Sequence, residues 1–130
     1  MNDEDPFVLL VTGGRDAGDR YEVIGYLTYV LQVPRRYSRR VVVRHGDCKT
    51  GVDAYAKAWA DETALLTGDP HPAENHGSWP ACGPRRNSHM VSLGADLCLA
   101  LPTRNSRGTW DCAEKAAKAG IPVRLWTVAS

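Results

Sequence analysis

The chain has 130 residues, of which 43% are hydrophobic and 24% are charged. This size and mixture predict one globular domain over residues 1–130, and they exclude a disordered chain, a fibrous chain and a second domain. The 16 basic and 15 acidic residues leave a net charge of +1, so no overall excess of charge attracts nucleic acid or an anionic membrane. Any anion site must therefore be local.

The first half of the chain alternates strands with helices. Residues 7–11 are a continuous apolar run broken by glycine at 13, which predicts a buried strand. Apolar residues at helical spacing predict a helix over residues 21–31, ended by Pro34. A β-branched strand follows at residues 41–43, then a helix whose apolar face begins at Val52. Residues 64–67 suggest a weaker strand, and residues 68–83 a long irregular loop.

The second half continues the alternation. We expect a helix over residues 84–93, a strand over 96–101, a helix over 109–119 closed by Gly120, and a last strand over 123–128. Strands that alternate with helices at this spacing favour right-handed crossovers between parallel strands. The sequence therefore predicts an α/β fold, a Rossmann-like three-layer sandwich with a mostly parallel sheet of about five strands and helices on both faces.

The four cysteines are widely spaced and form no C-x-x-C pair, and no signal peptide or long apolar run accompanies them. This usage predicts a cytoplasmic protein without disulfides or a membrane anchor. Cys98 and Cys112 lie in apolar elements, where we expect buried thiols. Cys48 lies beside Lys49 at a helix start, an arrangement that lowers a thiol pKa. A reactive thiolate is therefore an alternative there to a plain turn cysteine.

Two further clusters are candidate sites. The first cluster lies in the long loop and the following helix and consists of His71, His76, Cys82 and His89. The spacing of these residues matches no trusted zinc pattern, so we expect no metal there. We also expect no cofactor. Arg35, Arg36, Arg39 and Arg40 fall in a connection between a helix and a strand. A solvated linker is the simpler interpretation of these arginines, and a contact with nucleic acid or a partner protein is the alternative.

Three polar turns that contain glycine follow predicted strands: TGGRD (12–16), GDCKTGVD (46–53) and RGT (107–109). Open parallel sheets bind ligands at the carboxyl ends of their strands, where the strand order reverses. Glycine lets the backbone approach a ligand closely, and a following helix directs free N–H groups at an anion. Phosphate is the obvious candidate.

A fourth segment, GPRRNSHM (83–90), places two arginines near a helix start. They are either bidentate donors for phosphate or solvated surface side chains. The ligand contacts predicted from all four segments are Gly13, Gly14, Arg15, Gly46, Asp47, Thr50, Gly51, Asp53, Gly83, Arg86, Asn87, Arg107, Gly108 and Thr109.

An ordered set of motifs covers nearly the whole chain: TGGRD (12–16), HGDCKTGVDAYAKAWA (45–60), HPAENHG (71–77), CGPRRNSHM (82–90), GADLCLALP (94–102) and SRGTWDCAEKAAKAGIPV (106–123). The set resembles the SLOG superfamily, and more narrowly the cpYpsA-related SLOG family of actinobacteria and their phages. The resemblance implies a Rossmann-like domain that binds a nucleotide or a nucleotide-derived ligand such as ADP-ribose. By analogy it also implies a homodimer or a higher homo-oligomer.

The Lonely Guy enzymes of this superfamily cleave the N-glycosidic bond of a nucleoside monophosphate. Their R-K-x-x-M segment is matched by Arg86, Asn87 and Met90, and the G-T of their P-G-G-x-G-T-x-x-E loop by Gly108 and Thr109. Cys112 stands where those enzymes have the glutamate of that loop. The family's P-A-D-W ending appears as PAEN (72–75), with Trp79 displaced downstream, so the resemblance assigns no residue that stacks on a base.

Two functions from different classes remain open. The first is a binding module that senses or sequesters a nucleotide-derived molecule, with Arg15, Arg86 and the turn at 108–109 holding its phosphates. The second is a hydrolase that acts on a nucleoside monophosphate or a related N-glycoside. In the second case Arg86 positions the phosphate, and Asp53 or Asp111 supplies the carboxylate that cleavage requires.

Overall fold

A computed structural model describes residues 5–130. Its sheet contains β1 (Phe7–Gly13), β2 (Val41–His45), β3 (Leu66–Pro70), β4 (Leu97–Leu101) and β5 (Val123–Leu125). The strands lie in the order β3-β2-β1-β4-β5 and all neighbouring pairs are parallel. The predicted α/β class and Rossmann-like sheet are therefore confirmed.

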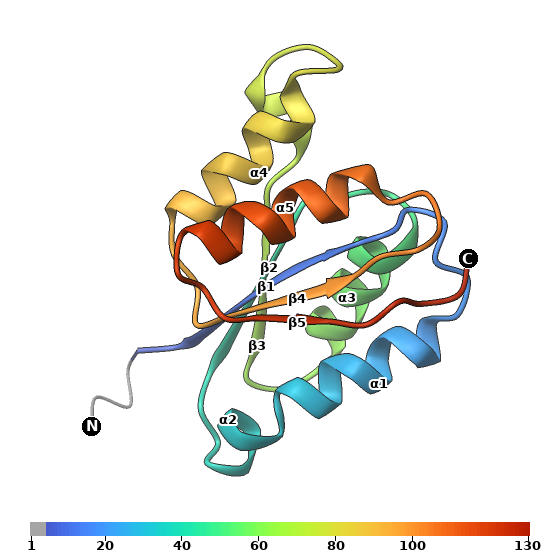
Figure 1. The fold of residues 1–130 in the computed structure, drawn as a ribbon. Coiled ribbons are helices and arrows are strands. Elements are labelled where there is room, and N and C mark those ends of the chain that lie inside the picture. Colours follow the sequence, from blue (N-terminus) through green and yellow to red (C-terminus); the bar gives the residue numbers. More distant parts are fainter. Residues whose placement is uncertain (1–4) are drawn as a thin grey trace.

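Helices cover both faces of this sheet (Figure 1). On one face lie α1 (Arg20–Val30) and α3 (Gly51–Glu62), and the short α2 (Gln32–Arg36) extends from the end of α1. On the other face lie α4 (Cys82–Ser92) and α5 (Arg107–Lys118), with the 3₁₀ turn η1 (Ala73–His76) against α4.

The central strand β1 is buried on both faces, as its continuous apolar run predicts. Leu9 and Val11 pack into the core beneath α1 and α3, whereas Leu10 packs with Met90 beneath α4 and α5. The second core also holds Cys98 and Cys112, and burial raises the pKa of these thiols to about 12 and about 11. All four cysteines are free.

Several predicted boundaries are wrong by a few residues. Pro34 does not end the first helix, which stops at Val30; it lies in the first turn of α2, where its missing N–H has no helical acceptor to lose. The third strand runs over Leu66–Pro70 because Leu65 has a positive φ and breaks the extended run before it. The irregular loop is correspondingly shorter, and η1 interrupts it.

The last strand ends at Leu125 rather than at residue 128. Beyond it, the N–H groups of Trp126 and Val128 still donate to the carbonyls of Ala100 and Pro102, so the chain continues alongside β4 without regular pairing. Both α4 and α5 begin two residues earlier than predicted, which makes Arg107, Gly108 and Thr109 the first turn of α5. Across the described part of the chain, every helix is too short or too polar to cross a bilayer.

Candidate functional site

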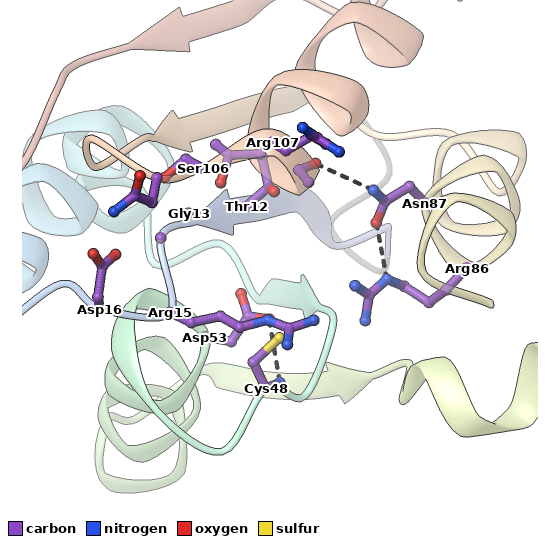
Figure 2. Close-up of a pocket in the computed structure, with 14 residues that line it drawn as sticks. Thr12, Gly13, Arg15, Asp16, Cys48, Asp53, Arg86, Asn87, Ser106 and Arg107 are labelled. Atoms are coloured by element: carbon purple, nitrogen blue, oxygen red, sulfur yellow. Dashed lines mark hydrogen bonds between the residues drawn. The ribbon is translucent and has the colours of Figure 1, made fainter. Parts of the chain in front are cut away.

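A pocket of about 470 Å³ opens where the strand order reverses, between the carboxyl ends of β1 and β4. Ligand sites of open parallel sheets are found at this position. Figure 2 shows the side chains that converge on it from three layers of the fold. The lining residues are Thr12, Gly13, Gly14, Arg15, Asp16, Cys48, Asp53, Arg86, Asn87, Asn105, Ser106, Arg107, Gly108 and Thr109.

The first turn of α5 forms one wall of this pocket, and no side chain caps it. Ser106 is the N-cap residue, but its Oγ accepts a hydrogen bond from the N–H of Thr103 at 2.6 Å instead of bonding to its own helix. The first backbone bond of the helix runs from the N–H of Trp110 to the carbonyl of Ser106, at 3.1 Å. The positive end of the helix dipole therefore faces the pocket. The N–H groups of the first turn have no hydrogen-bond acceptor within residues 5–130.

Arg86 of α4 reaches the same pocket and is 7% exposed. Its Nη1 donates to the carbonyls of Gly46 at 2.6 Å and His71 at 3.2 Å, so the ends of β2 and β3 fix the guanidinium. Its Nε donates to Asn87 Oδ1 at 2.8 Å. No hydrogen bond from the described part of the chain engages Nη2, which leaves one end of a rigid donor for a ligand.

Asn87 connects Arg86 to the start of α5 (Figure 2). Its Nδ2 donates to the carbonyl of Gly108 at 3.2 Å and to the Asp111 carboxylate at 3.0 Å. Since both polar atoms already have protein partners, Asn87 orients the pocket wall more than it offers groups to a ligand. Asp111 accepts a second bond from Lys115 at 2.9 Å and is not among the lining residues.

Asp53 lies in the first turn of α3 and is 6% exposed. Burial raises the pKa of its carboxyl group, and interactions with His45, with Cys48 and with Arg86 offset that effect only in part. The N–H of Cys48 donates to Asp53 Oδ2 at 3.3 Å. Burial, reinforced by the Asp53 charge, raises the pKa of the Cys48 thiol to about 11. The reactive-thiolate alternative for Cys48 is therefore wrong.

The glycines of the first two turns were expected to let the backbone approach a ligand. In the structure they instead allow other segments of the chain to pack against the backbone. A Cβ at Gly13 would lie 2.4 Å from the side chain of Val52, and one at Gly51 would lie 2.2 Å from the carbonyl oxygen of Gly14. Gly51 also has a φ of +72°. The space where a Cβ would lie is also occupied at Gly14, by the side chain of Thr103, and at Gly46, by the side chain of Arg86.

Gly108 is different, because a Cβ added there would meet open space. It lies in the first turn of α5 and lines the pocket. At the other glycines of the three predicted turns, another part of the chain occupies the space where a Cβ would lie. At Gly108 that space is empty, and the residue lines the pocket.

The remaining predicted residues do not line this pocket. A second pocket of about 240 Å³ is lined by Gly46, Asp47 and Thr50, and it shares Arg15, Cys48 and Arg86 with the first. Gly51 lies beneath the loop after β1, and Gly83 contacts the ring of Trp79. Asp47 accepts ion-pair contacts from Lys57 at 3.4 Å and Lys49 at 3.8 Å.

Several lining residues were not predicted from the sequence, among them Thr12, Asp16, Asn105 and Ser106 of the first pocket and Trp79 of the second. Trp79 is the largest of these side chains. It lies in the second pocket and is 55% exposed, and the Arg15 guanidinium stands 5.2 Å from its ring centroid. Because Trp79 lies downstream of the position that the P-A-D-W motif gives to its tryptophan, the motif did not identify it. A tryptophan inside a long polar loop was the remaining signal, because a large aromatic side chain without an amphipathic element is a frequent binding-site feature.

The histidines of the loop and α4 approach one another without forming a metal site. The ring of His89 lies 5.6 Å from that of His71 and 5.1 Å from that of His76, measured between centroids. Over residues 5–130, no three His, Cys, Asp or Glu side chains are grouped so that they could hold a metal ion.

The fold and the pocket define an α/β protein with a Rossmann-type sheet and a ligand-sized cavity at its switch point. The Gene 61 protein of Mycobacterium phage D29 is 39% identical to the chain over 119 residues, which make up 88% of this chain and 92% of that protein. The chain therefore belongs to the family of this phage protein. No protein-family model and no solved structure matches it.

Proposed function

We propose that the protein binds a nucleotide or a nucleotide-derived phosphorylated ligand at the carboxyl ends of β1 and β4. The observation that carries this proposal is the convergence of the uncapped start of α5 and the buried Arg86 on one cavity. Free helix amides and a fixed guanidinium are complementary to a phosphate, and both would remain unsatisfied in an apolar ligand complex. Arg15 and Arg107 line the same cavity and add positive charge.

The motif order supports placing the protein in the SLOG superfamily, whose members are thought to bind such ligands. The free cysteines fit a cytoplasmic protein, where nucleotides are abundant. A homodimer is part of the proposal by analogy alone.

A second candidate function is cleavage of an N-glycosidic bond, and one observation favours it. Asp53 lines the pocket and its raised pKa suits a group that gives or takes a proton. Asp111 is the weaker candidate for this step, since Asn87 and Lys115 already bind its carboxylate. Binding without cleavage is the function that the geometry supports best, because Cys112 replaces the glutamate expected for catalysis and is fully buried.

The test is a titration with AMP and with ADP-ribose, followed by calorimetry and by chromatography for released base. We expect saturable binding and no release. Gly108→Ala is the informative variant, because the new methyl group has space in the free protein but blocks close approach of a phosphate. It should keep the melting temperature and weaken binding by about tenfold or more. Absence of binding to both compounds contradicts the proposal, and base release that disappears in Asp53→Asn favours the hydrolase.

A further inference from the structure

The second pocket contains an exposed tryptophan, which is unusual in a polar loop. Trp79 lines it, more than half of the side chain is exposed, and the ring lies against Gly83 at the start of α4, where a Cβ would be 3.4 Å from the ring edge. An exposed tryptophan costs hydrophobic free energy unless something covers it. In the free protein that cover is the Arg15 guanidinium, 5.2 Å from the ring centroid.

The two pockets are neighbours that share three lining residues, Arg15, Cys48 and Arg86. The first presents helix amides and guanidinium groups. The second presents an aromatic face together with Glu74, Lys49 and Asp47, whose carboxylate already pairs with Lys49 and Lys57. A ligand that fills both must therefore be anionic at one end and flat and aromatic at the other.

We propose that Trp79 is the platform on which the base of a nucleotide stacks while its phosphate lies at the start of α5. This inference rests on the proposed function and adds the subsite that distinguishes a nucleotide from a simple sugar phosphate. Arg15 lines both pockets, so a phosphate in the first draws its guanidinium away from Trp79 and uncovers the ring for the base. Stacking on an aromatic side chain accepts any base, because every base has a π-face.

The test compares AMP with ribose 5-phosphate, which lacks the base, by calorimetry on the whole protein. The wild type should bind AMP about tenfold or more tightly than ribose 5-phosphate, given the usual strength of base stacking. Trp79→Ala should bring AMP to the affinity of ribose 5-phosphate and leave ribose 5-phosphate unchanged. Trp79→Phe, which keeps an aromatic face, should retain most of the preference.

Trp110→Ala is the matched control, because Trp110 is 47% exposed and lines neither pocket. It should leave the ratio of the two affinities unchanged. Equal binding of AMP and ribose 5-phosphate by the wild type overturns the base platform while the phosphate site stands. The base platform is also overturned if Trp79→Ala weakens binding of both compounds equally. If the wild type binds neither compound, the proposed function itself fails.

Discussion

Helices α3 and α5 begin alike in the sequence, each after a parallel strand and a polar turn with glycine, yet their first turns differ in the structure. At α3 the chain consumes its own donors: the N–H of Val52 donates to the carbonyl of Gly14 at 3.1 Å, and the Asp53 carboxylate lies in the first turn. No side chain caps either helix, and at α5 no acidic residue lies in the first turn. The first helix start carries a carboxyl group of its own, whereas the second is open to an external anion.

This difference shows that a glycine-rich turn before a helix has two distinct uses. Gly51 is needed so that the start of α3 can approach the loop after β1, whereas Gly108 leaves space beside the start of α5. Both turns use glycine. What differs is whether the space where a Cβ would lie is occupied by the chain, as at Gly51, or empty, as at Gly108. Substitutions at or beside one helix start at a time can separate the two uses.

The largest effect is expected for Gly51→Ala. The added methyl group would lie 2.2 Å from the carbonyl oxygen of Gly14, in a left-handed backbone conformation. Strain and overpacking together should lower the free energy of unfolding by about 2–5 kcal/mol. Urea denaturation measures the loss, and Gly108→Ala is the control that should unfold at the wild-type urea concentration or slightly above it. Equal stabilities for the two variants would remove the distinction between the helix starts.

Arg86→Gln should have the next largest effect. Losing the guanidinium leaves the carbonyls of Gly46 and His71 without that donor, which should cost about 1–3 kcal/mol of stability. Affinity for AMP should fall by about tenfold or more. Arg107→Gln, at an exposed position in the same pocket, should change stability by less than about 0.5 kcal/mol. If the two variants lose affinity for AMP equally while Arg86→Gln stays as stable as the wild type, the guanidinium of Arg86 is not a fixed donor.

Asp53→Asn should stabilise the protein at neutral pH. Because the folded state raises the pKa of Asp53 above its unfolded value, ionisation opposes folding. The penalty is absent below the unfolded pKa, grows as the pH rises towards the folded pKa, and is constant above it. The variant should therefore melt at a higher temperature than the wild type at pH 7, and the gap should narrow towards pH 4. A variant that melts below the wild type at both pH values contradicts a raised pKa.

Asp111→Asn should have the smallest effect. Its carboxylate is paired with Lys115 at 2.9 Å on a partly exposed surface of α5, and such pairs contribute about 0.5 kcal/mol or less. Binding of AMP should be unchanged, since Asp111 does not line the pocket. A loss of binding or of any base release in this variant would bring Asp111 back into the site.

Much of the fold follows from the sequence alone, because continuous apolar strands and amphipathic helices are local signals. A parallel sheet places the turns after all its strands at one edge, and the observed order β3-β2-β1-β4-β5 makes the turns after β1 and β4 neighbours. The burial of Arg86 could not be predicted, since the carbonyls that hold it belong to the ends of two other strands. Nor could the position of Trp79, because the path of an irregular loop depends on tertiary contacts that have no sequence period.

The most direct test of an open α5 start is a ¹H–¹⁵N NMR titration of the protein with AMP. We predict that the amide resonances of Arg107, Gly108 and Thr109 shift most among helix starts, in the direction of stronger hydrogen bonding. Those of Gly51, Val52 and Asp53 should move little. Shifts concentrated at the start of α3, or no saturable shifts at either helix, would contradict an open α5 start.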